Sequence, residues 1–133
     1  MKLITYRAFW FTGLVFIFLL AGCSQQSQSG GAVKAVEAYI QALVAKDRNQ
    51  VSNLSCSTWE EQGLLEVDSL EVVDTTLDNL GCQETGTDGE DTLVSCTGKI
   101  VMSYNGENQE IDLSTKTYRA IQAGGDWRMC GYK

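Results

Sequence analysis

The sequence predicts an α+β domain in which N-terminal helices pack on a curved antiparallel sheet of about four strands. Two observations predict this arrangement. Between positions 32 and 67, apolar residues recur at three- and four-residue steps, which is the period of amphipathic helices. From about position 70 onward, runs rich in Val, Thr and Leu alternate with turns that contain Gly, Asp or Asn, and such runs are typical of strands.

The first 22 residues have the composition of a signal peptide. Lys2 and Arg7 precede a largely apolar run of 13 residues, Ala8 to Leu20, which is shorter than the roughly 20 residues of a transmembrane helix. The run ends in Leu20-Ala21-Gly22-Cys23, which resembles the lipobox of bacterial lipoproteins. The resemblance implies that Cys23 is acylated by a diacylglyceryl group and palmitate and becomes the first mature residue. The alternative is an ordinary secretory signal followed by an accidental cysteine.

Removal of residues 1–22 leaves 111 residues, the size of one small domain. These carry 8 basic and 17 acidic residues, a net charge of −9. So acidic a domain is not expected to bind nucleic acid, and the lipid alone would hold it on the extracytoplasmic side of a cell membrane or outer membrane. Residues 23–31 are predicted to be the lipidated cysteine and a flexible tether, and residues 32–133 the single domain.

The helical part is predicted to contain three helices. The first begins at Ala32 and carries an apolar stripe. Asp47 interrupts that stripe and is predicted to cap a short second helix. Ser57 or Thr58 is predicted to cap a third helix, which ends near Val67.

Four strand regions follow the helices: Leu70 to Cys82, Asp91 to Tyr104, Ile111 to Gln122 and Trp127 to Tyr132. A Gly- and Asp-rich turn over residues 84–90 is predicted to join the first two. Asn105-Gly106 predicts a type I′ hairpin turn after the second, because both positions of that turn need a positive φ.

Four cysteines remain once the first is assigned to the lipid, and an even number in an oxidising compartment predicts disulfides. Cys82 and Cys96 are symmetric about Gly89 in the first turn, so an antiparallel hairpin places them opposite one another. Cys56 is then left for Cys130, which would join the helices to the last strand. The chain has no CxxC motif and no histidine, so a redox or zinc site is disfavoured, and we expect no metal and no cofactor.

The order of elements resembles a known superfamily. The segment Ala32-Val33-Lys34-Ala35-Val36-Glu37-Ala38-Tyr39, two shorter helices and strands that end in Trp127-Arg128-Met129 are similar to nuclear transport factor 2-like (cystatin-like cone) domains, including those of bacterial lipoproteins of unknown function. The resemblance implies that residues 32–133 enclose a conical pocket. It also implies either non-catalytic binding or lyase and isomerase chemistry.

Enzymes of this superfamily commonly use His, Asp and Tyr inside the cone. The absence of histidine means that a base in this chain would be a carboxylate. We therefore expect a non-catalytic domain that binds a small ligand or a protein partner, with a lyase or isomerase that uses a carboxylate base as the alternative.

Five aromatic residues are candidates for lining the pocket, and each would also suit an ordinary core: Tyr39, Trp59, Tyr118, Trp127 and Tyr132. Asp112 lies between two apolar residues of a predicted strand. Because side chains alternate along a strand, Asp112 is expected to face solvent if its neighbours face the core.

Two acidic clusters each allow two interpretations. Asp88-Gly89-Glu90-Asp91 is either a weak calcium site or, as we expect, a solvated hairpin tip. The other cluster is either a surface for a protein partner or a solvated face, which we favour: Glu60, Glu61, Glu66, Asp68, Glu71 and Asp74.

Overall fold

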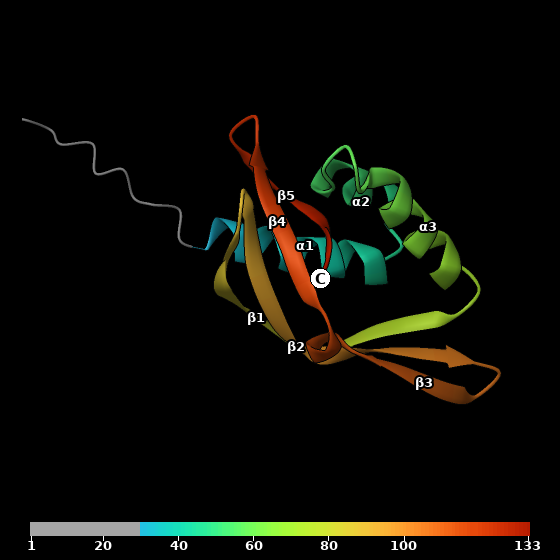
Figure 1. The fold of residues 1–133 in the computed structure, drawn as a ribbon. Coiled ribbons are helices and arrows are strands. Elements are labelled where there is room, and N and C mark those ends of the chain that lie inside the picture. Colours follow the sequence, from blue (N-terminus) through green and yellow to red (C-terminus); the bar gives the residue numbers. More distant parts are fainter. Residues whose placement is uncertain (1–29) are drawn as a thin grey trace, which may run out of the picture.

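The computed structural model describes residues 30–133 and confirms the α+β class (Figure 1). Three helices come first: α1 (Gly31–Val44), α2 (Arg48–Leu54) and α3 (Glu60–Leu70). A five-stranded antiparallel sheet follows: β1 (Asp74–Asp88), β2 (Asp91–Tyr104), β3 (Glu107–Asp112), β4 (Thr117–Ala123) and β5 (Asp126–Tyr132). No helix within residues 30–133 is long and apolar enough to cross a membrane. The predicted signal peptide and Cys23 lie outside the described residues.

The helix boundaries agree with the predicted ones at α2 and differ at α3. Asp47 caps α2, since its carboxylate accepts a hydrogen bond of 3.0 Å from the backbone N–H of Gln50. The predicted Ser57 or Thr58 cap of α3 is wrong. The helix begins at Glu60 with Trp59 at the N-cap, one or two residues later, and the Cys56 carbonyl oxygen accepts the N–H groups of Trp59 and Glu60 in the turn before it. It also continues to Leu70, which is buried against the core.

The sheet has the order β1-β2-β4-β5, and β3 pairs with the second half of β2. The single strand predicted over residues 111–122 is wrong, because β2 pairs with β4 through residues 92–95 and with β3 through residues 99–104. The chain passes from one to the other through a 3-10 turn, Leu113–Thr115. That turn buries Leu113 and is capped by Asp112, whose carboxylate accepts the Ser114 N–H at 2.8 Å.

The first hairpin is longer than predicted. β1 begins at Asp74 and continues to Asp88, so the turn is only Gly89-Glu90 rather than residues 84–90. The second hairpin turn is confirmed as type I′, with φ of 52° at Asn105 and 83° at Gly106.

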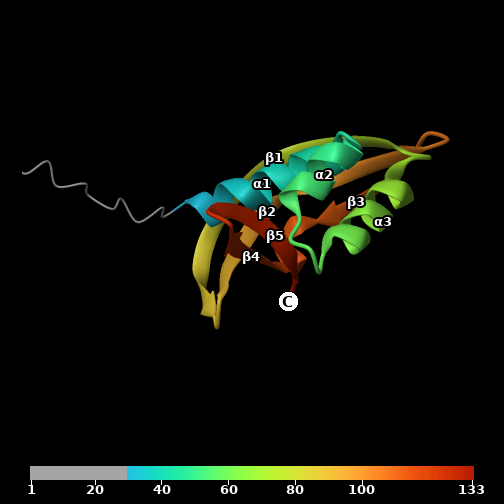
Figure 2. The ribbon, with the colours of Figure 1, turned by 90° about the horizontal axis from the view of Figure 1, so that it is seen from above.

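Bulges bend this sheet around α1, as the view from above shows (Figure 2). In β1, Asn79 and Leu80 together face Gly98 of β2. In β5, Cys130 and Gly131 together face a single residue of β4, Arg119.

The bulge in β5 decides which side chains face the helices. Met129 pairs with Ala120 and Tyr132 pairs with Tyr118, so the members of each pair lie on the same face of the sheet. Met129 and Tyr132 are three residues apart, and without the extra residue they would face opposite sides. The bulge therefore brings Tyr132 to the face that the helices cover.

The core lies between the concave face of the sheet and the helices, and its largest fully buried side chains are Tyr39, Ile40, Met129, Val36, Val51, Val67 and Val94. Two disulfides crosslink the elements around this core, and they join the cysteine pairs that the sequence predicts. Cys82–Cys96 links β1 to β2, and Cys56–Cys130 links the connection between α2 and α3 to β5.

Candidate functional site

A pocket of about 200 Å³ lies between the helices and the sheet. All layers contribute apolar side chains to it: Ile40 and Leu43 from α1, Leu70 from α3, Ile100 from β2, and Ile111 and Leu113 from the chain after β2. Its polar lining residues are Glu66, Ser69, Lys116, Tyr118 and Tyr132. The volume is below the roughly 300–1,000 Å³ of pockets for drug-sized molecules, so a ligand of this pocket would be small.

The carboxylate of Glu66 is the centre of a hydrogen-bond network. Its Oε2 accepts the hydroxyl of Tyr39 at 2.8 Å and the hydroxyl of Tyr132 at 2.9 Å. Trp59 in turn donates its indole N–H to the Tyr39 hydroxyl oxygen at 3.1 Å. This chain of donors polarises the Tyr39 hydroxyl toward the carboxylate and fixes the rotamer of Glu66. Glu66 Oε1 has no hydrogen-bond partner among residues 30–133.

A helical glycine allows α1 and α3 to approach closely enough for this network. Gly63 lies one turn before Glu66 and Val67, on the buried face of α3. A Cβ atom at Gly63 would lie 2.9 Å from the Tyr39 hydroxyl oxygen and 3.1 Å from the Ser55 hydroxyl oxygen. Any larger residue would therefore push α3 away from the hydroxyl group that Glu66 needs.

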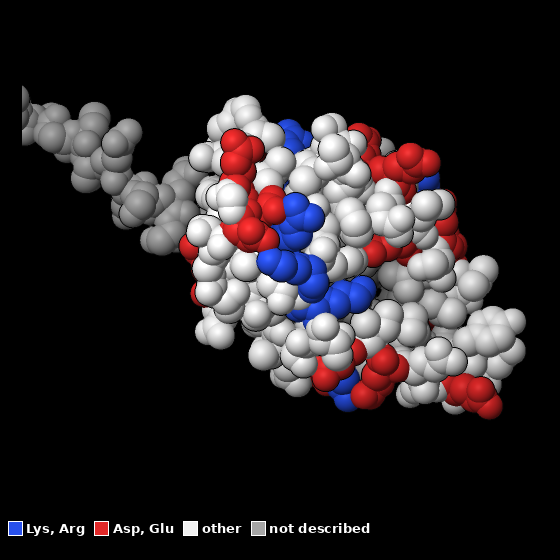
Figure 3. Space-filling view, viewed as in Figure 1, with Lys and Arg blue, Asp and Glu red and all other residues white. Residues whose placement is uncertain are grey.

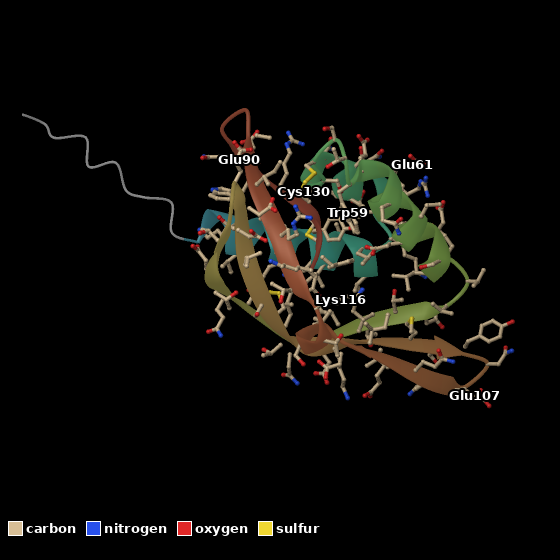
Figure 4. All side chains as sticks on the ribbon, viewed as in Figure 1. Trp59, Glu61, Glu90, Glu107, Lys116 and Cys130 are labelled. Atoms are coloured by element: carbon tan, nitrogen blue, oxygen red, sulfur yellow. A yellow bond between two sulfur atoms is a disulfide. The ribbon has the colours of Figure 1, made fainter. Side chains whose placement is uncertain are left out.

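The ring of Tyr132 packs against three other side chains. The ring of Trp59 contacts it edge-on with centroids 5.1 Å apart, and the ring of Tyr118 does so at 5.3 Å. Lys116 Nζ lies 4.0 Å from the Tyr132 ring centroid, a cation–π arrangement. Figure 4 labels Trp59 near the Cys130 disulfide and Lys116 toward the start of β4.

The three tyrosine hydroxyls stay protonated at neutral pH. Burial, with a smaller contribution from the charge of Glu66, raises the pKa of Tyr39 and of Tyr132 well above the usual range. The same causes raise the pKa of Tyr118 to about 12. Tyr118 is only 2% exposed, lines the pocket and has no hydrogen-bond partner for its hydroxyl among the described residues. Its hydroxyl is thus available to a ligand.

Four of the five predicted aromatic residues belong to this site. Tyr118 and Tyr132 line the pocket. Tyr39 donates a hydrogen bond to Glu66, and Trp59 donates one to Tyr39. Trp127 does not line this pocket. Its ring lies against Gly31 at the start of α1, where a Cβ atom on Gly31 would come within 2.3 Å of it.

Glu66 and Lys116 were not predicted to be site residues. Glu66 was predicted to belong to an exposed acidic surface, and this was wrong, because Glu66 is half-buried and turned toward the pocket. The helical spacing of Gly63, Glu66, Val67 and Leu70 is a signal that this residue shares the buried face of α3. No comparable pattern marks Lys116, which lies between the 3-10 turn and β4.

The other acidic candidates lie on the surface, except Asp91, whose side chain is half-buried. Asp88 forms an ion pair with Lys133, and Asp91 forms one with Arg119. Within residues 30–133, no three Asp, Glu, Cys or His side chains are grouped so as to hold a metal ion. Figure 3 shows basic side chains gathered over β4 and the C-terminal end, with acidic side chains around them. Asp112 is exposed, as expected, and caps the 3-10 turn.

Comparisons with known proteins identify the fold and no family. No protein-family model matches the sequence, and no curated protein matches it. The structure is similar to the solution structure of a SEC-C motif containing protein from Rhodopseudomonas palustris, with a TM-score of 0.53 and 13% sequence identity. The match covers 80% of this chain and 81% of that chain. At this identity the similarity is one of fold, which is α+β with helices packed on an antiparallel sheet.

Proposed function

We propose that the mature protein is a lipid-anchored extracytoplasmic domain that binds a small ligand and does not convert it. The observation that carries this proposal is the pocket at Glu66, in which an apolar wall surrounds a carboxylate held by two tyrosines. Small-molecule sites combine an apolar lining with a few oriented polar groups in this way. A core that served stability alone would gain more from apolar contacts than from a carboxylate and an unpartnered hydroxyl.

The proposed domain type is the nuclear transport factor 2-like cone. Its support is the order of three helices followed by a curved antiparallel sheet, together with a pocket between the two layers. The proposed anchor is Cys23. Its support is Leu20-Ala21-Gly22-Cys23 after a short apolar run, and the even number of cysteines that remain in two disulfides.

Substitution of Cys23 tests the anchor. We expect Cys23→Ser, produced in a bacterial host, to lose acylation and to remain uncleaved before position 23, because the thiol is the atom that receives the lipid. Mass spectrometry of the N-terminal peptide measures both changes. Ser24→Ala is the matched control and should be acylated and cleaved normally. A Cys23→Ser protein that is still acylated and cleaved would show that Cys23 is not the lipidated residue.

Native mass spectrometry tests the pocket. We expect residues 24–133, secreted to an oxidising periplasm, to carry a small molecule that is released by unfolding. Ile111→Trp should lower its occupancy several-fold, because Ile111 is half-buried and lines the pocket. Leu65→Trp is the control, since Leu65 is 55% exposed on α3. Equal occupancy in the two variants would show that the molecule binds elsewhere.

One observation favours the alternative, a lyase or isomerase. The free Oε1 of Glu66 and the hydroxyl of Tyr118 belong to one pocket, and a carboxylate can act there as a general base. Incubation of the recovered molecule with fresh protein separates the two functions. An unchanged molecule supports binding. Conversion by the wild-type protein, lost in Glu66→Gln, would support the enzyme.

A further inference from the structure

The charge and the donor–acceptor balance of the pocket identify a ligand class, and this inference rests on the proposed function. We propose that the pocket binds a small primary amine with an apolar body, whose ammonium group donates to Glu66 Oε1 and to the Tyr118 hydroxyl oxygen. The Tyr39 and Tyr132 hydrogen bonds to Oε2 hold the Glu66 carboxylate in position for that group.

Glu66 is a carboxylate without a cationic partner. Both of its hydrogen-bond donors are neutral phenols, and none of the ion pairs among residues 30–133 includes it. A half-buried carboxylate gains most from a charged donor, because an ammonium group adds the Coulomb attraction of an opposite charge to the hydrogen bond. An ammonium group supplies three donors and no acceptor.

The remaining polar atoms near Glu66 suit a donor-rich group. The Tyr118 ring is buried, and its hydroxyl has no hydrogen-bond partner among the described residues, so the hydroxyl oxygen is free to accept from a ligand. The Tyr132 hydroxyl gives its proton to Glu66 and therefore faces any further partner as an acceptor. An ammonium group would thus meet a carboxylate oxygen and phenol oxygens. A ligand carboxylate at the same place could accept a hydrogen bond from the Tyr118 hydroxyl, but it would lie against the like charge of Glu66.

The apolar part of the pocket sets the body of the ligand. Six aliphatic side chains surround a volume of about 200 Å³, so the body is expected to be a short alkyl or single-ring group. Burial of each CH₂ group contributes roughly 0.8 kcal/mol, so affinity should rise with chain length until the pocket is full.

Lys116 is the group that would favour an anion instead. Its ammonium already lies over the Tyr132 ring, and the half-buried side chain lines the same pocket. An anion at Lys116 would still enter a domain of net charge −9 and approach the Glu66 carboxylate, and both repel it. Lys116 repels an amine in turn, so the preference for an amine rests on the acidic net charge of the domain and on the unpaired Oε1 of Glu66.

The test uses three probes of matched length: hexylamine, hexanoate and hexanol. They are titrated into the mature lipid-bearing protein in an uncharged detergent, and binding is followed by Trp59 fluorescence and calorimetry. Wild type should bind hexylamine and not hexanoate. Glu66→Gln keeps an acceptor for both tyrosines and should weaken hexylamine binding about tenfold to a hundredfold, as expected for loss of a charged hydrogen bond.

Two further variants identify the contacts. Tyr118→Phe removes one hydroxyl from a buried ring and should weaken hexylamine several-fold without lowering the melting temperature. Lys116→Met removes a positive charge from the pocket lining and should tighten hexylamine binding. Partition of the probes into detergent is the same for all variants and therefore cancels.

The outcomes separate this proposal from the one it rests on. Binding of hexanoate that is lost in Lys116→Met, or binding of hexanol with an affinity equal to that of hexylamine, would overturn the amine proposal and leave ligand binding in place. Failure of all three probes, together with no recovered molecule in native mass spectrometry, would overturn both.

Discussion

Removal of the Cys56–Cys130 disulfide is expected to lower the free energy of unfolding by about 4 kcal/mol. The bridge closes a loop with a sequence separation of 74, and the entropy that a crosslink removes from the unfolded chain grows with loop length. The total stability of such a domain is only about 5–15 kcal/mol, so the loss should bring it close to its unfolding threshold. Urea unfolding of the Cys56→Ala/Cys130→Ala double variant measures the effect.

The second disulfide supplies the matched control. Cys82–Cys96 has a sequence separation of 14, and its removal should cost about 3 kcal/mol. Peptide mapping without reductant should find these two pairs in the wild-type protein. A Cys82→Ala/Cys96→Ala variant that is less stable than the Cys56→Ala/Cys130→Ala variant would contradict this order.

Removal of the Cys56–Cys130 disulfide should also lower the affinity of the pocket for its ligand. The bridge holds the start of α3 against β5, where the Cys56 N–H donates to the Met129 carbonyl oxygen at 2.8 Å. Trp59 and Tyr132 lie on either side of this junction, and both belong to the network at Glu66. The double variant should therefore bind ligand more weakly even where it remains folded.

Gly98→Ala is expected to cost at least about 3 kcal/mol. Gly98 has a φ of 100°, which an L-residue with a side chain rarely adopts. A Cβ atom there would also lie 2.5 Å from the backbone oxygens of Asp78 and Asn79, within the bulge that curves the sheet. Backbone oxygens in a paired strand cannot move aside as a flexible side chain can. Urea unfolding monitored by Trp fluorescence measures the loss.

Gly124→Ala is the control for this prediction. Gly124 has a φ of 63° in the turn between β4 and β5, and a Cβ atom there would contact nothing within 4 Å. It should cost only about 1 kcal/mol, the strain of a left-handed backbone alone. Equal losses in the two variants would show that the contact at Gly98 relaxes without cost.

Local patterns in the sequence predicted the three helices, the first two strands and the last one. The three- and four-residue spacing after Ala32 predicted α1, Asp47 predicted the start of α2, and Asn105-Gly106 predicted the second hairpin. Each of these signals depends on a few neighbouring residues, so no knowledge of the tertiary structure was needed.

The pairing of Cys82 with Cys96 was predicted for a reason that was incomplete. The turn is centred between Gly89 and Glu90, so an undisturbed hairpin would place Cys82 opposite Thr97. The irregularity between Glu84 and Gly86 shifts the register by one residue and restores the pair. The symmetry about Gly89 predicted the correct pair, but Cys82 lies opposite Cys96 only because the bulge shifts the strand register.

The sequence by itself determined the α+β class, the starts of α1 and α2 to within one residue, and the candidate set of aromatic residues. Only the tertiary structure decided where the pocket lies and which carboxylate faces it. Glu66 turns inward because it meets the hydroxyls of Tyr39 and Tyr132, which are 27 and 66 residues away in the chain. The physical reason is that helical periodicity reports burial, whereas partners for a buried charge come from segments that only folding brings together.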